Sequence, residues 1–376
     1  MAVQARIGRY LHPGAWWVWA LGLAIAASRT TNPLILGLII AVLALVVAAR
    51  RPDAPWSRSF VVLLRLGLVV IAIRLVFQVL LGSPIGTTVV VTLPTVPLPS
   101  WAAGLRLGGP ITLESIVFAA CDGLRLAVLL ACVGAANSLA SPSRLLKAMP
   151  AALYEVGVAV VVAMTFAPQL VSDITRVRRA QRLRGRPDRG VRGLVGSAMP
   201  VFDGALDRAV TLAAAMDSRG YGRSAPIAPK RRIADAAMLL GGLVGICIGL
   251  FGVLDSSASG TTGLIILAIG VVIACVGIWR AGARSVRTRY RPDPWLWPEW
   301  AVCACGVAAA AAVFATGQID PEALLMPVTP LAMPVVPPLA LLGLCLAALP
   351  ATLSPPLPIP RTLDRQHRQL AQEVPA

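Results

Sequence analysis

The feature that most constrains this chain is a series of apolar runs, each close to the length of about 20 residues that a helix needs to cross a bilayer. Hydrophobic residues make up 57% of the 376 residues and charged residues only 14%. This composition excludes a disordered chain and an ordinary soluble domain. We predict membrane spans at 14–28, 33–49, 59–81, 114–139, 236–254, 261–279, 299–317 and 335–353.

Basic residues fall mostly on one side of the predicted membrane. The chain carries 34 Lys and Arg residues against 17 Asp and Glu residues. If the N-terminus is inside and the chain crosses at every span, the outside segments hold only Arg29 and Arg106. This is the positive-inside pattern of a multi-pass protein of the cell membrane. The positive charge therefore reflects topology, and we expect contact with membrane lipid but no binding to nucleic acid, since no basic motif is interleaved with aromatic residues.

A further apolar run, at 151–170, decides how much of the chain is cytoplasmic. If this run crossed the membrane, the strongly basic segment 171–235 would be outside and the charge bias would be lost. We interpret 151–170 as a helix that either lies in the membrane interface or dips into the bundle from the cytoplasmic side.

The predicted fold class is an all-α integral membrane protein, a polytopic helical bundle with a long cytoplasmic insertion. Its parts are N-terminal membrane helices at 1–139, the insertion at 140–235, C-terminal membrane helices at 236–353 and a disordered cytoplasmic tail at 354–376. In the outside loop at 82–113, the stretch 87–93 fits either a short strand or an extended segment. The prolines of this loop argue against regular structure there.

The sequence offers no residues for catalysis or for a cofactor. The two histidines, His12 and His367, lie at opposite ends of the chain and cannot form a metal site together. Phosphate-binding and dinucleotide-binding glycine motifs are absent from the sequence. The seven cysteines fall in apolar spans, where we expect them to be buried. We therefore expect no metal, no cofactor and no enzyme activity, and any ATP hydrolysis must come from another chain.

The insertion contains one motif twice. Residues 180–185 read Ala-Gln-Arg-Leu-Arg-Gly and residues 215–220 read Ala-Met-Asp-Ser-Arg-Gly. Ala and Arg four positions apart share one helix face, and the following Gly permits the left-handed residue that ends a helix. Each motif therefore predicts a helix end that presents an Arg beside a small residue. Such a pair suits docking to two copies of one partner or to two similar partners, although Arg-Gly is also a common helix end with no partner. The motif positions are Ala180, Arg184, Gly185, Ala215, Arg219 and Gly220.

Paired Ala-x-x-x-Arg-Gly motifs in a cytoplasmic insertion resemble the T component of energy-coupling factor (ECF) transporters, the group that includes the cobalt-transport membrane subunit. The segments 122–126, 141–148 and 166–168 add to the resemblance, which covers about 10–280. Leu183 and Ser218 stand before the motif arginines, where the family often has Ala. Residues 299–353 have no counterpart that we can match.

The resemblance implies a membrane scaffold that is not itself an enzyme. Two coupling helices would dock onto two ATP-binding-cassette ATPases (A components), with Arg184 and Arg219 each entering an acidic groove. The membrane helices would hold a substrate-binding S component, which captures a vitamin or a metal ion. This interpretation requires the two motif ends to lie near each other on the inner side of the membrane. Ends that lie far apart, in lipid or on the outer side would contradict it and leave only a polytopic helical protein.

Several charged residues fall within or beside the apolar runs. Charges inside a membrane are costly and usually face the bundle or a partner. Asp122 is expected to pair with Arg65 or Arg74, either to lock two helices, to grip the S component or to line a substrate path. We expect Glu114 to lie in the interface near the outer surface. The charged residues within the spans are Arg65, Arg74, Asp122 and Arg125.

Asp203 and Asp207 lie four residues apart on the second motif helix. They either pair with arginines of the first motif helix or are solvated. Two other functions compete with the scaffold interpretation. A self-contained secondary transporter requires repeated halves, and none is visible in the sequence. A membrane-embedded lipid transferase requires clustered Asp residues, whereas the acidic residues here are scattered.

Overall fold

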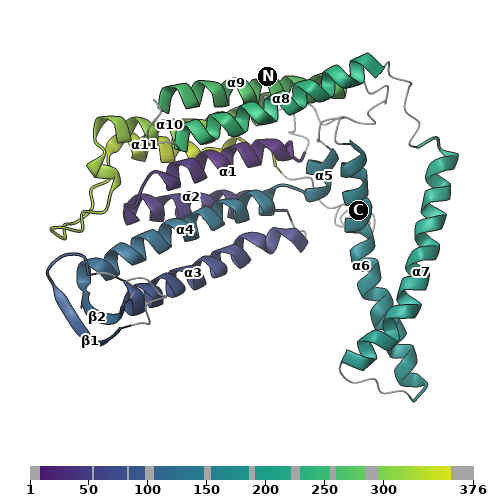
Figure 1. The fold of residues 1–376 in the computed structure, drawn as a ribbon, viewed down its shortest axis with the longest axis horizontal. Helices are drawn as coiled ribbons and strands as arrows, with labels where there is room; N and C mark the ends of the chain where they lie inside the picture. The colour runs from purple at the N-terminus through teal and green to yellow at the C-terminus, as the bar shows by residue number, and fades with distance from the viewer. Residues whose placement is uncertain are drawn as a thin grey trace, which may run out of the picture. The chain divides into compact units, whose positions relative to one another are not determined.

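The structure, a computed structural model, describes residues 9–52, 55–82, 84–97, 106–147, 154–185, 191–221, 229–254, 260–283 and 295–356. The described chain is almost entirely helical (Figure 1). It divides into two compact units, one formed by Met1–Leu145 with Asp293–Ala376 and the other by Leu146–Pro292. Most of the predicted tail at 354–376, including His367, lies outside the described residues.

Each of the first seven predicted spans corresponds to one helix, and the last, 335–353, is divided between two short helices. Within the described residues, seven helices are long and apolar enough to cross a membrane, and two shorter apolar segments are Pro13–Ser28 and Pro338–Leu353. The prediction of an all-α polytopic membrane protein is therefore confirmed. The helices of the first unit are α1 (Pro13–Ser28), α2 (Pro33–Arg50), α3 (Ser59–Leu81), α4 (Leu113–Leu139), α10 (Trp297–Ile319), α11 (Pro338–Ala348) and α12 (Pro350–Leu353), with short turns η1 (Pro55–Arg58) and η4 (Glu322–Leu324).

The N-termini of α1 and α2 are both capped by a side chain. His12 precedes Pro13, and its Nδ1 accepts a hydrogen bond from the Gly14 N–H at 3.1 Å. Asn32 precedes Pro33, and its Oδ1 accepts from the Leu34 N–H at 3.0 Å. Capping of free N–H groups, followed by proline in the first turn, starts a helix at a defined residue. The cap at Asn32 therefore lets α2 begin only a few residues after α1 ends.

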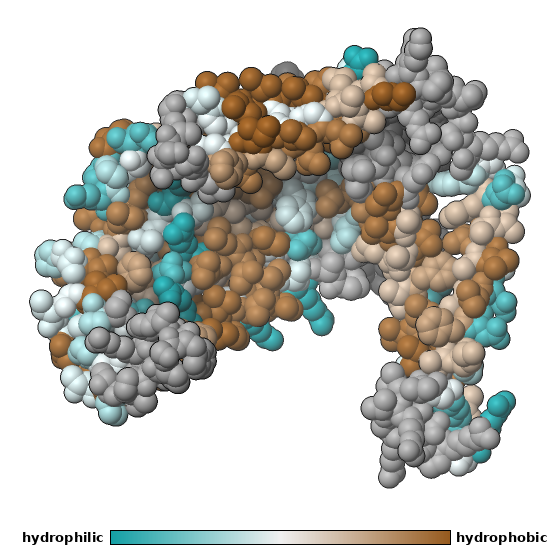
Figure 2. All heavy atoms as spheres, viewed as in Figure 1, coloured by the Kyte–Doolittle hydropathy of each residue, from teal (hydrophilic) through white to brown (hydrophobic). Residues whose placement is uncertain are grey.

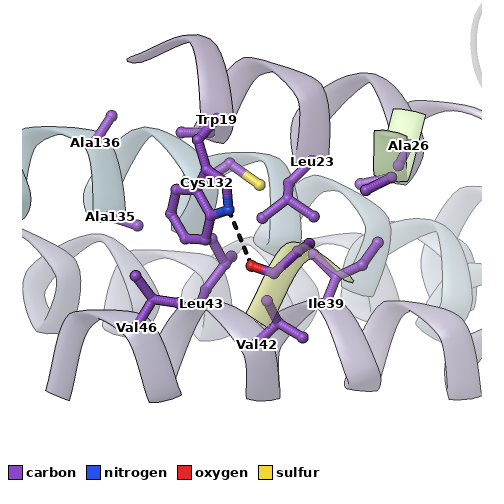
Figure 3. Packing of buried hydrophobic residues seen from close by; sticks show 14 of the residues in the cluster. Trp19, Leu23, Ala26, Ile39, Val42, Leu43, Val46, Cys132, Ala135 and Ala136 are labelled. Carbon is purple, nitrogen blue, oxygen red and sulfur yellow. Dashed lines mark hydrogen bonds between the residues drawn. The ribbon is translucent and has the colours of Figure 1, made fainter. Parts of the chain in front are cut away.

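The core of the first unit is built by helices from both ends of the chain. Trp19 and Leu23 of α1 lie among apolar side chains of α2 and α4 (Figure 3). The indole Nε1 of Trp19 donates a hydrogen bond to the carbonyl of Ala347 at 3.0 Å. A Cβ on Gly22 would lie 2.3 Å from the carbonyl oxygen of Gly306, so α1 and α10 approach as closely as backbones allow. The C-terminal helices α10 and α11 thus complete the N-terminal bundle.

Contacts at the two ends of this bundle agree with alternate crossing of the membrane. The loop before α2 contacts the α10–α11 connection, where Thr30 Oγ1 donates to the Leu324 carbonyl at 2.6 Å. At the other end, Arg50 Nε donates to the Ala351 carbonyl at 2.9 Å. Each contact joins two segments that the predicted topology places on the same side of the membrane.

The loop between α3 and α4 forms an antiparallel hairpin. Of the two alternatives for 87–93 the strand is the one that forms, whereas the expectation that the prolines prevent regular structure is wrong. Strand β1 (Val89–Pro97) pairs with β2 (Arg106–Thr112), with irregular register between Leu93 and Val96. Proline is tolerated in a two-stranded ribbon, because each strand has an edge that needs no partner. The prolines therefore do not abolish the pairing, whose register is irregular between Val89 and Val91 as well as between Leu93 and Val96.

The second unit contains two helix pairs. Helices α6 (Tyr154–Leu183) and α7 (Val191–Ser218) form one pair, and α8 (Pro229–Leu254) and α9 (Gly260–Ala283) form the other. The short α5 (Pro142–Lys147) contains the boundary between the two units, which falls after Leu145. The run at 151–170 is part of α6, whose window Val156–Leu183 is one of the seven candidate spans by length and composition. Only 6% of that window is buried.

Exposed apolar side chains cover much of several helices. Figure 2 shows them over α3 and over the α8–α9 pair, as expected of helices that face lipid. The cysteines are likewise divided between buried and exposed positions. Cys121, Cys132, Cys303 and Cys305 are buried, whereas Cys247, Cys275 and Cys345 are exposed, which corrects the expectation that all seven are buried.

Candidate coupling site on the paired helices

The first motif ends α6 in the predicted manner. Gly185 has a φ of +72°, in the left-handed region that favours glycine. Its N–H donates to the Arg182 carbonyl at 3.1 Å, and the Arg184 N–H donates to the Ala180 carbonyl at 3.2 Å. These bonds satisfy carbonyl groups of the last helical turn. The helix therefore stops at the motif and leaves Arg184 at its tip.

The second motif ends α7 in the same way, in a fuller form. Gly220 also has a φ of +72°. Its N–H donates to the Asp217 carbonyl at 2.8 Å, and the Tyr221 N–H donates to the Met216 carbonyl at 3.0 Å. This is the paired bonding of a Schellman motif. The predicted role of glycine in both motifs agrees with the backbone geometry.

Both motif faces are open to solvent. Ala180, Arg184, Ala215 and Arg219 are exposed. Among the residues that the structure describes, neither motif guanidinium has a hydrogen-bond or ion-pair partner. Leu183, beside Arg184, is 85% exposed.

The two helices run antiparallel. Asp173 of α6 forms an ion pair with Arg208 of α7, and the Gln181 Nε2 of α6 donates to the Gly196 carbonyl of α7 at 3.2 Å. Later positions on α6 therefore meet earlier positions on α7. Figure 1 shows the pair meeting around the α6 C-terminus and the α7 N-terminus.

This arrangement separates the motif ends, which corrects the expectation that they lie near each other. Arg184 lies at the end of α6 where Gly196 is close. From Gly196, α7 rises about 1.5 Å per residue, which carries Arg219 about 35 Å away. The physical reason is that two consecutive helices with a short connection fold back on each other. Their C-terminal ends then lie at opposite ends of the pair.

The expected pairing of Asp203 and Asp207 with arginines of α6 is not formed. Both carboxylates are exposed and have no partner among the described residues, as the solvated alternative predicted. The ion pair between the helices has the opposite polarity, because α6 supplies the acid, Asp173, and α7 supplies the base, Arg208. Sequence reasoning missed this pair, since Asp173 stands in a run of ordinary helix-surface residues.

The charges within the membrane spans are divided among different roles. Arg74 Nε lies 3.0 Å from Asp122 Oδ2, so of the two pairings considered for Asp122 the one with Arg74 forms and links α3 to α4. Arg125 donates to the carbonyl of Ser28 at the end of α1. Arg65 is exposed and has no partner among the described residues.

Glu114 is a buried anchor for the segment before β1. The residue is 6% exposed, and its Oε1 accepts hydrogen bonds from the Thr88 N–H at 3.1 Å and the Thr88 hydroxyl at 2.7 Å. Gly86 has a φ of +83°, and a Cβ there would lie 2.6 Å from the Glu114 carboxyl carbon. Glycine is therefore required for this close approach.

The structure also contains a buried ion pair that sequence reasoning missed. Arg9 Nη2 lies 2.5 Å from Glu299 Oε1 and 2.7 Å from Oε2, and Glu299 is 1% exposed. The carboxylate also accepts from the Leu296 N–H at 3.1 Å and the His12 N–H at 3.4 Å. The sequence signal that could have found it is a Glu in the first turn of an apolar helix. If such a Glu is buried, it requires a basic partner.

Comparison with known proteins identifies the family. The model of the family described as "Cobalt transport protein", CbiQ, matches residues 4–228. This range contains α1 to α7 and both motifs, and it ends before α8, earlier than the limit near 280 that the resemblance suggested.

Two curated relatives are energy-coupling factor transporter transmembrane proteins, EcfT. The protein from Streptococcus thermophilus is 37% identical over 93 residues, which cover 23% of this chain and 34% of that protein. The protein from Leuconostoc gelidum subsp. gasicomitatum is 32% identical over 92 residues, with the same coverage of 23% and 34%. The chain thus spans about a third of the length of these relatives. Because the family model covers more than half of the sequence, this multi-pass membrane chain belongs to the cobalt transport protein family, CbiQ.

Proposed function

We propose that this chain is the transmembrane T component of an ECF importer, which couples partner ATPases to a substrate-binding S component. The observation that carries the proposal is the pair of exposed arginines, Arg184 and Arg219, at two helix ends of the same backbone geometry. Both lie inside the range that matches the CbiQ family. ATP hydrolysis belongs to the partners, and the S component selects the substrate.

The chemistry of each motif end suits an acidic groove on an ATPase. A guanidinium presents a planar fork of donors that matches a carboxylate, and such charge-assisted bonds are about twice as strong as neutral ones. The neighbouring Ala leaves room for close approach on the same helix face. At the first end, Leu183 adds an apolar contact that only a partner can bury.

The separation of the two ends counts against the close pair that the resemblance led us to expect, and the proposal therefore rests on their exposure and matching backbone geometry. The distance is compatible with two partner subunits. A globular domain of about 200 residues is roughly 40 Å across, by the usual scaling of the radius of gyration. The ends of α6 and α7 are about 35 Å apart along α7. Each end can therefore engage its own ATPase when two such subunits lie side by side.

The antiparallel arrangement also bears on membrane topology. If α6 and α7 both crossed the bilayer, their C-terminal ends would lie on opposite sides, and only one motif would reach cytoplasmic ATPases. We therefore propose that the pair lies on the cytoplasmic side with the N-terminus, although α6 is long and apolar enough to cross. The basic residues of 171–235 support the same orientation.

Co-purification tests the coupling role. The full chain, tagged and co-expressed with the ATPase and S subunits of its importer, is compared with Arg184→Ala, Arg219→Ala and the double variant. Arg176→Ala is the matched control, because Arg176 is an exposed arginine of α6 outside the motif. We expect the control to retain both ATPases, each single variant to lose part of the ATPase, and the double variant to lose nearly all of it.

The S component provides an internal check on folding in this experiment. It should remain with every variant, because the motif arginines lie on the α6–α7 pair rather than in the membrane bundle. Equal ATPase recovery from the double variant and from Arg176→Ala would contradict the coupling role. Loss of both the S component and the ATPases would contradict the proposal that the motif ends act in ATPase binding alone.

A further inference from the structure

Three tryptophans lie at the start of α10, a helix beyond the residues that match the CbiQ family. Trp295 is 39% exposed, and Trp297 and Trp300 are 69% and 65% exposed. Tryptophan combines a large apolar ring system with a polar N–H, and in folded proteins it is mostly buried. Three exposed tryptophans so close together indicate a surface that something other than water covers.

The position of these tryptophans on the bundle is fixed by contacts. The centre of the Trp295 ring lies 4.9 Å from that of His12 and 5.2 Å from that of Trp300. Glu299, in the same turn of the helix, is held by Arg9. The tryptophans therefore belong to the end of the bundle where α1 begins.

An exposed face of α10 continues from the tryptophans along the helix. Its residues recur three or four positions apart, so they share one side of the helix. The opposite side carries buried residues such as Val302 and Ala309, which pack in the core of the first unit. We call the exposed face the α10 stripe, and none of its residues is charged. Its residues are Trp297, Trp300, Ala304, Val307, Ala311 and Phe314.

The α10 stripe matches the thickness of a bilayer. The helix has 23 residues, so at about 1.5 Å per residue it is about 35 Å long, slightly more than the hydrocarbon thickness of about 30 Å. Its first turn, with Trp297 and Trp300, then falls at one edge of the hydrocarbon. Towards the other edge, the Arg29 guanidinium lies 5.6 Å from the centre of the Phe314 ring. Tryptophan at the headgroup level and a basic side chain that reaches the interface are typical of a helix in contact with lipid.

We propose that the α10 stripe faces lipid in the assembled importer, with Trp297 and Trp300 anchored at the headgroup level. A protein partner would find no charged group on the stripe with which to fix its register, whereas lipid requires none. The helices beyond the family range would then form a lipid-facing wall of the bundle, and the S component would bind another face. The proposal does not depend on the motif arginines, which belong to the other unit.

Quenching of tryptophan fluorescence by brominated phosphatidylcholine tests this proposal. The full chain is reconstituted in vesicles of lipid that is brominated either next to the headgroup or near the end of the acyl chain. The test variant, Trp297→Phe with Trp300→Phe, keeps an aromatic ring at each position. The emission that it loses relative to wild type is the signal of the stripe tryptophans. Trp16→Phe is the matched control, because Trp16 lies in the first turn of α1 and is 4% exposed.

In the isolated chain, the stripe signal should respond to the depth of the bromine. We expect bromine next to the headgroup to remove most of this signal and bromine near the chain end to remove much less, because tryptophan anchors at the interface. The emission lost in Trp16→Phe should be quenched little by either lipid, since protein encloses Trp16. Equally weak quenching of the two signals would overturn the proposal, and so would stronger quenching of the stripe signal by the deeper bromine.

The same measurement with the ATPases and the S component bound distinguishes lipid from a protein partner. Only this step rests on the proposed function. We expect the quenching of the stripe signal to be the same as in the isolated chain. Loss of quenching on assembly would show that a subunit covers the stripe and would overturn the proposal, whatever the motif arginines contribute to ATPase binding.

Discussion

Replacing Glu299 by Gln should strongly destabilise the membrane bundle. The carboxylate is 1% exposed and receives donors at both oxygens, from Arg9 and His12 at Oε1 and from Arg9 and Leu296 at Oε2. Gln keeps one oxygen and replaces the other by a donor amide. In either orientation, half of the present donors then face another donor.

The expected magnitude follows from these contacts. Hydrogen bonds to charged groups contribute about 1.5–3 kcal/mol each, and removing one member of a buried ion pair costs about 3–5 kcal/mol. We expect the free energy of unfolding to fall by about 3 kcal/mol, which corresponds to a melting temperature lower by about 6–12 °C for a domain of this size. Thermal unfolding in detergent, followed by size-exclusion chromatography with fluorescence detection, measures this change.

The control and a double-variant cycle make the experiment specific to the pair. Glu322→Gln makes the same chemical change at an exposed residue and should leave the melting temperature unchanged. The double variant Arg9→Ala with Glu299→Gln should lower the free energy of unfolding by less than the sum of the two single variants. The reason is that each single substitution leaves the remaining member of the pair without its partner. A melting temperature for Glu299→Gln within about 2 °C of the control, less than 1 kcal/mol on the same scale, would refute the reasoning.

Three further predictions concern other contacts. Asp122→Asn should lower the melting temperature because it weakens the 3.0 Å pair with Arg74, whereas Arg65→Gln, at an exposed residue with no partner among the described ones, should not. Gly22→Ala should destabilise the bundle by about 1–3 kcal/mol through overpacking against Gly306, while Gly37→Ala, where a Cβ meets nothing within 4 Å, should be neutral in the same melting assay. Gly185→Ala should lower ATPase recovery in the co-purification assay, because a left-handed φ costs residues other than glycine about 1–2 kcal/mol. Gly185→Asn should recover more ATPase than Gly185→Ala, since Asn tolerates this conformation. Equal recovery from the two variants would contradict this prediction.

The membrane helices could be predicted because their signal is local. A run such as 59–81 or 114–139 is apolar throughout, and no tertiary contact is needed to identify it. The motif ends were also local, because Gly after Arg specifies a left-handed stop to the helix. Both Gly185 and Gly220 adopt that conformation.

The relations between helices could not be predicted in the same way. The partner of Asp122 depends on which faces of α3 and α4 meet, and the sequence left Arg65 and Arg74 equally eligible. The hairpin at β1 and β2 was missed because proline content was weighed without knowing that each strand has a free edge. The separation of the motif ends was missed because the motifs were compared as sequences, without the direction of the helices that carry them.

The two described parts of this chain differ in how they are stabilised, and this difference bears on how a scaffold could transmit movement. The bundle has a continuous buried core that includes Trp19 and Leu23, and it is closed by the Arg9–Glu299 pair. The α6 window is only 6% buried, and one ion pair and one side-chain hydrogen bond link it to α7 among the described residues. Elements with few buried contacts open and shift most easily. Helices of this kind gain much of their order from the surfaces that they bind, so partner ATPases that hold both motif ends would also set the angle between α6 and α7. The proposed coupling role therefore assigns movement to the α6–α7 pair and rigidity to the bundle.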